Sequence, residues 1–317
     1  MKFSSKVPTN IPEKTAIDNY LANRFTYHSI EEWRNIIKSG SVQRNGIIAV
    51  LEDTVLAHDE IIYDPGDFEE PPANLSYKII YEDEWYIGID KPANLLVHRA
   101  GRSFKNNLIY QLRYVNNPPF PESHTVHRLD RDTSGVVLVA KSGESCAKLS
   151  QQFAQKSLEK EYVAVVHGKF DTSIKRIDLP ICKAVCSSIP YKYQFDPKGK
   201  AASTLVIQSV MIGNSYSLLI LRPLTGRTHQ IRIHLAAVGN IIVGDKLYGM
   251  EEKAYLKWRE SPSEFTSEFM INRHALHCRM LSFIHPYYGK RVVVESETAS
   301  DMKELIMKLK KVKYDCK

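Results

Sequence analysis

The sequence predicts an α+β protein: a main domain built on a mixed, mostly antiparallel sheet, preceded by a small α/β unit. Strand-like and helix-like stretches alternate through residues 75–317. The strand candidates 204–210 and 217–224 are separated only by a short segment that contains Gly213-Asn214, a hairpin signal. Short hairpins pair strands antiparallel, whereas a doubly wound parallel sheet needs long crossover connections. We therefore expect the mixed, mostly antiparallel arrangement.

The N-terminal region predicts a compact unit of its own. Ser29 and Glu32 have the spacing of a capping box, so a helix is expected to begin at residue 30. Apolar residues follow at helical spacing as far as Gly40, which is suited to end the helix. Asn45-Gly46 then predicts a tight turn between two short strands. A helix followed by a hairpin indicates a small α/β unit.

A segment rich in proline and acidic residues divides the chain. It reads DPGDFEEPPAN at residues 64–74 and has little apolar content, which is typical of a linker. The 317 residues are too many for one small core and suit two domains. We expect an N-terminal module at 1–66, a linker at 67–74 and the main domain at 75–317.

Within the main domain, hydrophobic patterning predicts the order of the elements. Two strands separated by an acidic turn are expected within 77–98, and a helix is expected where Cys146, Leu149 and Phe153 share a face. An amphipathic helix is expected at the C-terminus, with apolar positions from Met302 to Val312. The remaining strand candidates are 136–140, 161–168, 204–210, 217–224, 275–286 and 290–296.

Composition is that of a globular protein. Hydrophobic residues make up 43% and charged residues 25%, and the formal net charge is +7. This basic excess permits an anionic partner such as a nucleic acid without demonstrating one. No stretch approaches the roughly 18 apolar residues of a membrane span, and no apolar signal segment opens the chain. The five cysteines are scattered, so we expect free thiols in the cytoplasm, no metal and no membrane.

Two polar segments stand against buried-looking apolar runs. The first, residues 127–135, places Asp130 between two arginines immediately before the strand candidate. The second, residues 224–235, reads as a strand end, a glycine turn and a helix start, with Thr228 as a possible cap. Ionisable groups are rarely buried without partners, so these segments indicate either a site or structural ion pairs.

Common catalytic motifs do not account for these segments. The sequence has no phosphate-binding loop, dinucleotide fingerprint, H-E-x-x-H helix or G-x-S-x-G elbow. His229 and His234 are five positions apart, which is not the spacing of a paired metal site on a helix. Asp130 and Asp132 would share a face in an extended segment, so a glycoside hydrolase with paired carboxylates is a possible alternative.

The two segments, together with three others, resemble a known family. HRLDRDTSGVVLVAKS (127–142) closely resembles the signature of RluA-type RNA pseudouridine synthases. Similar to that family, in the same order along the chain, are DKPANLLVH (90–98), KEYVAVVHG (160–168), PLTGRTHQIRIHLAAVGNIIVGDKLYG (223–249) and HALHCRMLSFIHP (274–286). The N-terminal unit more loosely resembles an S-four-like (alpha-L) RNA-binding module. The resemblance implies a pseudouridine synthase catalytic domain at 75–317.

The resemblance implies isomerisation of uridine to pseudouridine in RNA without a cofactor. The uridine must be flipped out of its stack to react. By motif match Asp130 is the essential carboxylate, acting at the sugar either as a nucleophile or as a base; the sequence does not choose between them. Asp132, Thr133 and Ser134 are expected to form the turn by bonding the loop's own backbone.

Three further residues take roles from the resemblance. Arg227 is expected to pair with Asp130 and keep it ionised. Tyr162 is expected to stack on the uracil and to be a candidate acceptor of the ring-carbon proton; the alternative is an ordinary strand tyrosine. Arg128 is expected to fill the space that the flipped base leaves, whereas a phosphate contact or a salt bridge would be its ordinary use.

The expected partner is structured RNA, with ribosomal RNA favoured over transfer RNA because of the N-terminal module, and the expected state is a monomer. The main alternative is a non-catalytic RNA-binding protein that retains the fold. Against it, Asp130, Tyr162 and Arg227 are all present.

Overall fold

The computed structural model describes residues 2–25, 27–64, 69–155 and 157–311. It divides into two compact units, of which the first comprises 1–72 and 99–106 and the second 73–98 and 107–317. The expected linker at 67–74 lies partly outside the described residues, and its described part, 69–74, is neither helix nor strand. Val312 and Cys316 also lie outside them.

The first unit combines two helices with short strands. Its elements are β1 (Phe3–Lys6), β2 (Thr15–Ala16), α1 (Ile17–Arg24), α2 (Ile30–Lys38), β3 (Val42–Arg44), β4 (Ile47–Ile48), β5 (Thr54–Val55) and β6 (Glu60–Tyr63). Four strands form a sheet in the order β1-β6-β3-β4, and β2 pairs with β5. Ser29 and Glu32 form both bonds of the expected capping box, so α2 begins as predicted.

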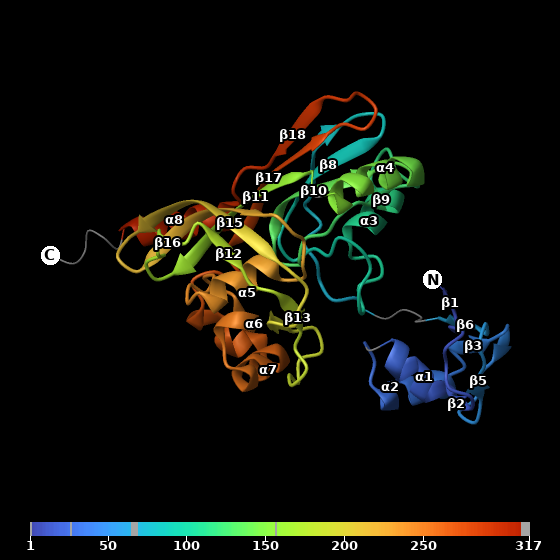
Figure 1. Ribbon diagram of the computed structural model, residues 1–317. Coiled ribbons are helices and arrows are strands. Elements are labelled where there is room, and N and C mark those ends of the chain that lie inside the picture. Colours follow the sequence, from blue (N-terminus) through green and yellow to red (C-terminus); the bar gives the residue numbers. More distant parts are fainter. Residues whose placement is uncertain (1, 26, 65–68, 156, 312–317) are drawn as a thin grey trace. The chain divides into compact units, whose positions relative to one another are not determined.

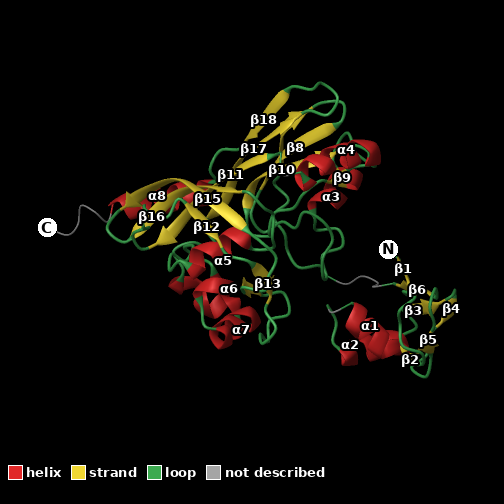
Figure 2. Ribbon diagram, viewed as in Figure 1, coloured by secondary structure: helices red, strands yellow, loops and turns green. Residues whose placement is uncertain are grey.

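The second unit contains a ten-stranded sheet (Figures 1 and 2). Its strands are β7 (Lys78–Glu82), β8 (Tyr86–Lys91), β9 (His124–Thr125), β10 (Ser134–Ala140), β11 (Glu159–His167), β12 (Arg176–Asp178), β15 (Ser203–Ile212), β16 (Tyr216–Pro223), β17 (Leu276–Ile284) and β18 (Arg291–Glu295). A separate pair comprises β13 (Ile181–Lys183) and β14 (Tyr193–Phe195).

The order of the main sheet is β12-β15-β16-β11-β17-β10-β8-β7, with β18 added to β17 and β9 to β10. Of the strand pairs in this sheet, β10 with β17 is parallel and the others are antiparallel. The predicted mixed, mostly antiparallel α+β fold is therefore confirmed.

Helices flank both halves of this sheet, as Figure 2 shows. They are α3 (Leu108–Tyr110), a π-helix (Gln111–Val115), α4 (Gly143–Ala154), α5 (Gln230–Ala237), α6 (Lys246–Gly249), α7 (Glu252–Glu260), a 3-10 helix (Pro262–Glu268) and α8 (Ser300–Lys311). The helix α4 contacts β10, whereas α5 and α8 contact β15. No helix in the described part of the chain is long and apolar enough to cross a membrane.

The parallel junction in the middle of the sheet depends on a glycine. Gly135 opposes Cys278 in the two-residue pairing of β10 with β17, and its φ is +108°. A Cβ atom at this position would lie 2.1 Å from the Cys278 carbonyl oxygen, so no other residue fits without displacing a strand. This close approach fixes the start of β10, and with it the loop that precedes the strand.

Candidate active site

Asp130 lies on a loop that is fastened at both ends. The strand that follows, β10, is buried throughout. Before Asp130, the His127 ring accepts a 2.9 Å hydrogen bond from the Leu138 N–H group. After it, Thr133 is bonded to His274 at 2.8 Å. The loop therefore holds the Asp130 carboxylate in a fixed direction.

The expectation that Thr133 and Ser134 bond the loop's own backbone is wrong for their side chains. The Thr133 hydroxyl bonds the His274 ring, and the Ser134 hydroxyl bonds the His277 ring at 2.9 Å. Both histidines lie at the start of β17 or just before it. The hydroxyls thus tie the loop to a strand far away in the sequence, which local turn chemistry cannot foresee.

Lys91 also supports the loop that carries Asp130. Its side chain is fully buried, and its ammonium donates to the carbonyl oxygens of Pro92, Leu95 and Arg131 at 2.9, 2.9 and 3.0 Å. Burial lowers the pKa of Lys91 to about 7, although Asp132 opposes the shift. Because Arg131 follows Asp130 directly, Lys91 positions the Asp130 loop.

Lys91→Met is expected to destabilise the protein by about 1–3 kcal/mol, because three carbonyl groups, of which that of Leu95 is buried, lose their donor. The lowered pKa of Lys91 also makes the difference in stability between the wild type and Lys91→Met depend on pH. Between pH 7 and 10.5 the unfolded lysine binds more protons than the folded one, so wild-type stability gains with rising pH from this group. Urea unfolding across that range should show that the free energy of unfolding of the wild type rises relative to that of Lys91→Met. A constant or shrinking difference between the two free energies would contradict this account.

The Asp130 carboxylate faces an arginine and a histidine. Arg232 Nη1 donates to Asp130 Oδ2 at 3.2 Å, and His229 Nε2 lies 3.8 Å from the same oxygen. Burial alone would raise the pKa of Asp130, but His229 and Arg232 hold it below its usual value. Burial lowers the pKa of His229 to about 4, so at neutral pH the imidazole is uncharged and Arg232 is the cation that keeps Asp130 ionised.

Arg232 is itself held by a second carboxylate. Its Nε and Nη2 atoms donate to the two Asp245 oxygens at 2.7 and 2.9 Å, a bidentate pair. The Tyr248 ring centroid lies 5.0 Å from the guanidinium carbon. Burial would lower the pKa of Arg232, but Asp245 and Asp130 raise it, so the guanidinium stays charged. Its direction toward Asp130 is therefore fixed by residues on α6 and at its start.

The predicted pairing of Arg227 with Asp130 is wrong in this structure. Arg227 is exposed, and its Nε atom donates to the Ala201 carbonyl oxygen at 3.2 Å. The predicted cap at Thr228 is also wrong, because His229, in a left-handed conformation with φ of +56°, occupies the N-cap position of α5. The helix therefore starts one residue later than expected, and Arg232 in its first turn reaches the carboxylate.

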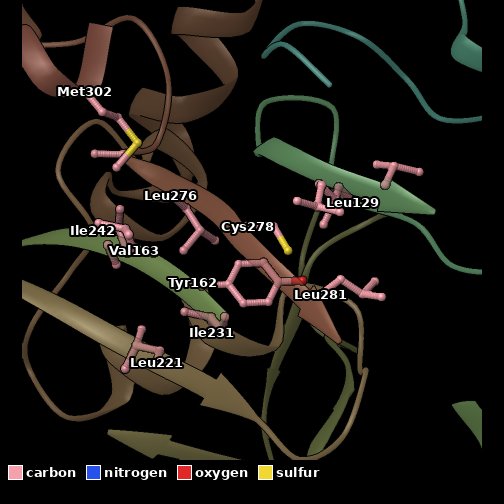
Figure 3. Close-up of a cluster of buried hydrophobic side chains, with 14 of the residues drawn as sticks. Leu129, Tyr162, Val163, Leu221, Ile231, Ile242, Leu276, Cys278, Leu281 and Met302 are labelled. Atoms are coloured by element: carbon pink, nitrogen blue, oxygen red, sulfur yellow. The ribbon is translucent and has the colours of Figure 1, made fainter. Parts of the chain in front are cut away.

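Tyr162 lies on β11 beside the parallel junction. It is buried, pairs with Cys278 on β17, and has its ring among Leu129, Ile231 and Cys278 in Figure 3. Burial raises the pKa of Tyr162 well above its usual value, with Cys278 and Asp130 adding to the shift. The phenol is therefore neutral and presents mainly an apolar ring.

One pocket contains all four residues predicted from the sequence. It is lined by Asp130 and Tyr162, and Arg128 and Arg227 contribute exposed side chains. The Arg128 guanidinium forms no hydrogen bond or ion pair with any residue that the structure describes. The other lining residues are Leu129, Thr133, Lys160, Pro223, Thr225, Gly226, Thr228, His229, Gln230, Ile231, Arg232 and Leu276.

Sequence reasoning missed Arg232, Asp245, Lys91 and Lys160 as parts of this region. All four stand inside segments already singled out, but which of several cations reaches Asp130 depends on where α5 begins. Among residues 2–25, 27–64, 69–155 and 157–311, no group of three or more histidine, cysteine or acidic side chains is arranged to hold a metal ion. The pocket is a carboxylate–arginine pair beside an apolar wall.

Comparisons with known proteins agree with the resemblance. The family model described as RNA pseudouridylate synthase matches residues 85–237, which include Asp130, Tyr162 and Arg232. The chain is 32% identical to ribosomal large subunit pseudouridine synthase D of Zymomonas mobilis, covering 92% of this chain and 93% of that protein. It is 34% identical to ribosomal large subunit pseudouridine synthase C of Buchnera aphidicola, covering 92% of each.

Among solved structures, the chain is similar to human RNA pseudouridylate synthase domain containing 1. The TM-score is 0.55 at 25% identity, over 72% of this chain and 86% of that one. Identity above 30% over nearly the whole length, together with the shared fold and the matched pocket segments, places the chain in one family. It belongs to the RNA pseudouridylate synthases of the RluA type and is an RNA pseudouridine synthase.

Proposed function

We propose that this enzyme isomerises a specific uridine of ribosomal RNA to pseudouridine, using Asp130. The observation that carries the proposal is the ionised Asp130 carboxylate, held by Arg232 in the pocket that Tyr162 lines. Ribosomal RNA is favoured over transfer RNA because relatives across most of the chain are named ribosomal large subunit pseudouridine synthases.

The proposed reaction balances within one nucleotide. The bond between ribose C1′ and uracil N1 breaks, a bond from C1′ to C5 forms, C5 loses a proton and N1 gains one, so no cofactor is consumed. Asp130 acts at the ribose, as a nucleophile on C1′ or as the base at C2′, and both require its ionised form. Arg232 favours that form and sets its direction.

Tyr162 is proposed to pack its ring against the uracil. A neutral phenol is a weak base, and burial raises the pKa of Tyr162, which favours packing over acceptance of the C5 proton. The buried ring offers a flat apolar surface to a flipped base.

Arg128 and Arg227 are proposed to bind the parts of the RNA that remain outside the pocket when the base is flipped. Both side chains are exposed. The free guanidinium of Arg128 is suited to fill the gap that the flipped base leaves in the RNA stack, since its plane stacks on neighbouring bases. Arg227 is suited to a backbone phosphate.

The N-terminal unit is proposed to be an S-four-like module that adds RNA affinity. Its exposed cations include Arg24 at the end of α1 and Lys38 at the end of α2. Arg24→Glu with Lys38→Glu is expected to weaken RNA binding and to reduce the slope of log K against log salt by about 1 per lost phosphate contact. Filter binding at several salt concentrations measures both. Lys148→Glu, a charge reversal on α4 of the other unit, is the control, and equal effects of the two changes would contradict the proposal.

A map of modified sites in cells tests the proposed function. Ribosomal RNA from cells that lack the gene should have uridine at one or more positions where wild-type RNA has pseudouridine, detected by carbodiimide labelling and primer extension. A plasmid with the wild-type gene should restore the modification. An unchanged ribosomal RNA map, with pseudouridine missing from transfer RNA instead, would overturn the choice of substrate.

A further inference from the structure

Lys160 adds a further cation to the active-site pocket, which Arg128, Arg227 and Arg232 also line, and it is not the cation that pairs with Asp130. It lies on β11, two residues before Tyr162, and both side chains line the pocket. Its ammonium lies 5.5 Å from the Phe153 ring centroid and 3.9 Å from where a Cβ atom at Gly226 would be. The charge therefore sits between β11 and the turn that leads to α5.

Among the described residues, this ammonium has no counter-ion. No hydrogen bond or ion pair joins it to another residue in the described part of the chain. The acidic neighbours on its own strand are engaged elsewhere, because Glu159 and Glu161 pair with Arg222 at 3.3 and 2.8 Å. Burial lowers the pKa of Lys160, which is the expected effect of holding an ammonium without a partner. A partly buried cation of this kind is prepared for an anionic or strongly polar ligand.

The position of Lys160 favours the base of the flipped nucleotide over its phosphate. Arg128 and Arg227 line the same pocket, and their exposed side chains can bind a phosphate that stays hydrated. Lys160 is partly buried beside Tyr162 and the Phe153 ring. A base packed on Tyr162 would bring its polar edge within reach of a side chain two residues along the same strand face.

We propose that the Lys160 ammonium donates a hydrogen bond to a carbonyl oxygen of the flipped uracil and stabilises the negative charge that the base acquires as its glycosidic bond breaks. This inference rests on the proposed function. When the bond from C1′ to N1 breaks, its electron pair stays with the uracil and spreads to the carbonyl oxygens. A fixed cation at that edge favours the transition state more than the ground state, as an oxyanion hole does. Lys160 keeps its proton throughout.

Lys160→Met tests the charge with little change in side-chain length. Its single-turnover rate at saturating RNA should fall about 100-fold, the usual effect of removing one such donor, while the Kd for RNA stays nearly unchanged. Lys160→Arg, which keeps the charge, should recover much of the rate. Lys148→Met is the matched control, because Lys148 is an α4 lysine that pairs with Glu144 and lies outside the pocket.

A change of leaving group separates this role from a structural one. Synthetic RNA with uridine or 5-fluorouridine at the mapped site is digested after reaction, and loss of the target nucleoside is followed by mass spectrometry. Fluorine withdraws electrons and stabilises the uracil anion, so this base needs less help from Lys160. The rate ratio of wild type to Lys160→Met should therefore be several-fold smaller for 5-fluorouridine than for uridine.

An equal ratio for the two bases, or an effect confined to Kd, would overturn the inference, and the second result would indicate a phosphate contact. If Lys160→Met does not fold by circular dichroism, Lys160→Gln serves for the same comparison. Failure of the wild-type enzyme to convert uridine would count against the proposed function. Normal wild-type turnover with an unchanged leaving-group ratio would count against Lys160 alone.

Discussion

Asp130→Asn is expected to abolish pseudouridine formation, with a loss of at least about 10⁴-fold in the single-turnover rate. Asparagine has the same shape but is neither a nucleophile nor a base at the ribose. The fold should persist, because Arg232 keeps its bidentate pair with Asp245 and Lys91 still holds the loop through Arg131. The rate is measured as tritium released from carbon 5 of labelled uridine in RNA.

Two controls accompany this variant. Circular dichroism and the melting temperature report folding, and filter binding should give a Kd for RNA close to that of the wild type. Asp132→Asn changes the neighbouring carboxylate, which makes no direct contact with Arg232 in the described structure, and should retain most activity. Turnover by Asp130→Asn near the wild-type rate would refute the assignment of the catalytic carboxylate.

Arg232→Met is expected to impair both catalysis and stability. Asp245 has a side chain that is 1% exposed and would be left as an unpaired buried charge, which typically costs about 3–5 kcal/mol. Asp130 would also lose its hydrogen-bonded cation, so its pKa should rise and its direction should vary. Arg232→Lys should recover only part of either property, because one ammonium cannot reproduce the bidentate pair.

Arg227→Met is the matched comparison, because Arg227 lines the same pocket but pairs with neither aspartate. It should raise KM while changing the rate at saturating RNA far less than Arg232→Met does, and it should leave the melting temperature nearly unchanged. Thermal unfolding, steady-state kinetics for KM, and single-turnover kinetics for the rate at saturating RNA give these values for the three variants. A larger loss of the rate at saturating RNA for Arg227→Met than for Arg232→Lys would indicate that Arg227, rather than Arg232, is the partner of Asp130.

Much of the fold is readable from the sequence because its signals are local. The capping box of Ser29 and Glu32 sets the start of α2, and β15 and β16 form the hairpin that Gly213-Asn214 predicts. The parallel pairing of β10 with β17 is different. It joins Gly135 to Cys278 across more than a hundred residues, and only the tertiary contact reveals why glycine is required there.

The site divides in the same way. Residues 127–135 and 224–235 were identifiable as polar segments against buried strands, and both line the pocket. The choice of Arg232 over Arg227 depends on the left-handed backbone of His229, which delays the start of α5. Lys91 is informative only once its three carbonyl partners are known. The sequence pattern therefore identifies the segments that line the pocket, whereas the backbone geometry determines that Arg232 is the cation that contacts Asp130.

The central claim is tested most directly by tritium release from RNA labelled at carbon 5 of uracil, with separate ribosomal and transfer RNA pools from cells that lack the gene. The purified enzyme should release tritium from the ribosomal pool, and Asp130→Asn should release none. Release from the transfer RNA pool alone would contradict the substrate. No release from either pool by folded protein that binds RNA would contradict the proposed function itself.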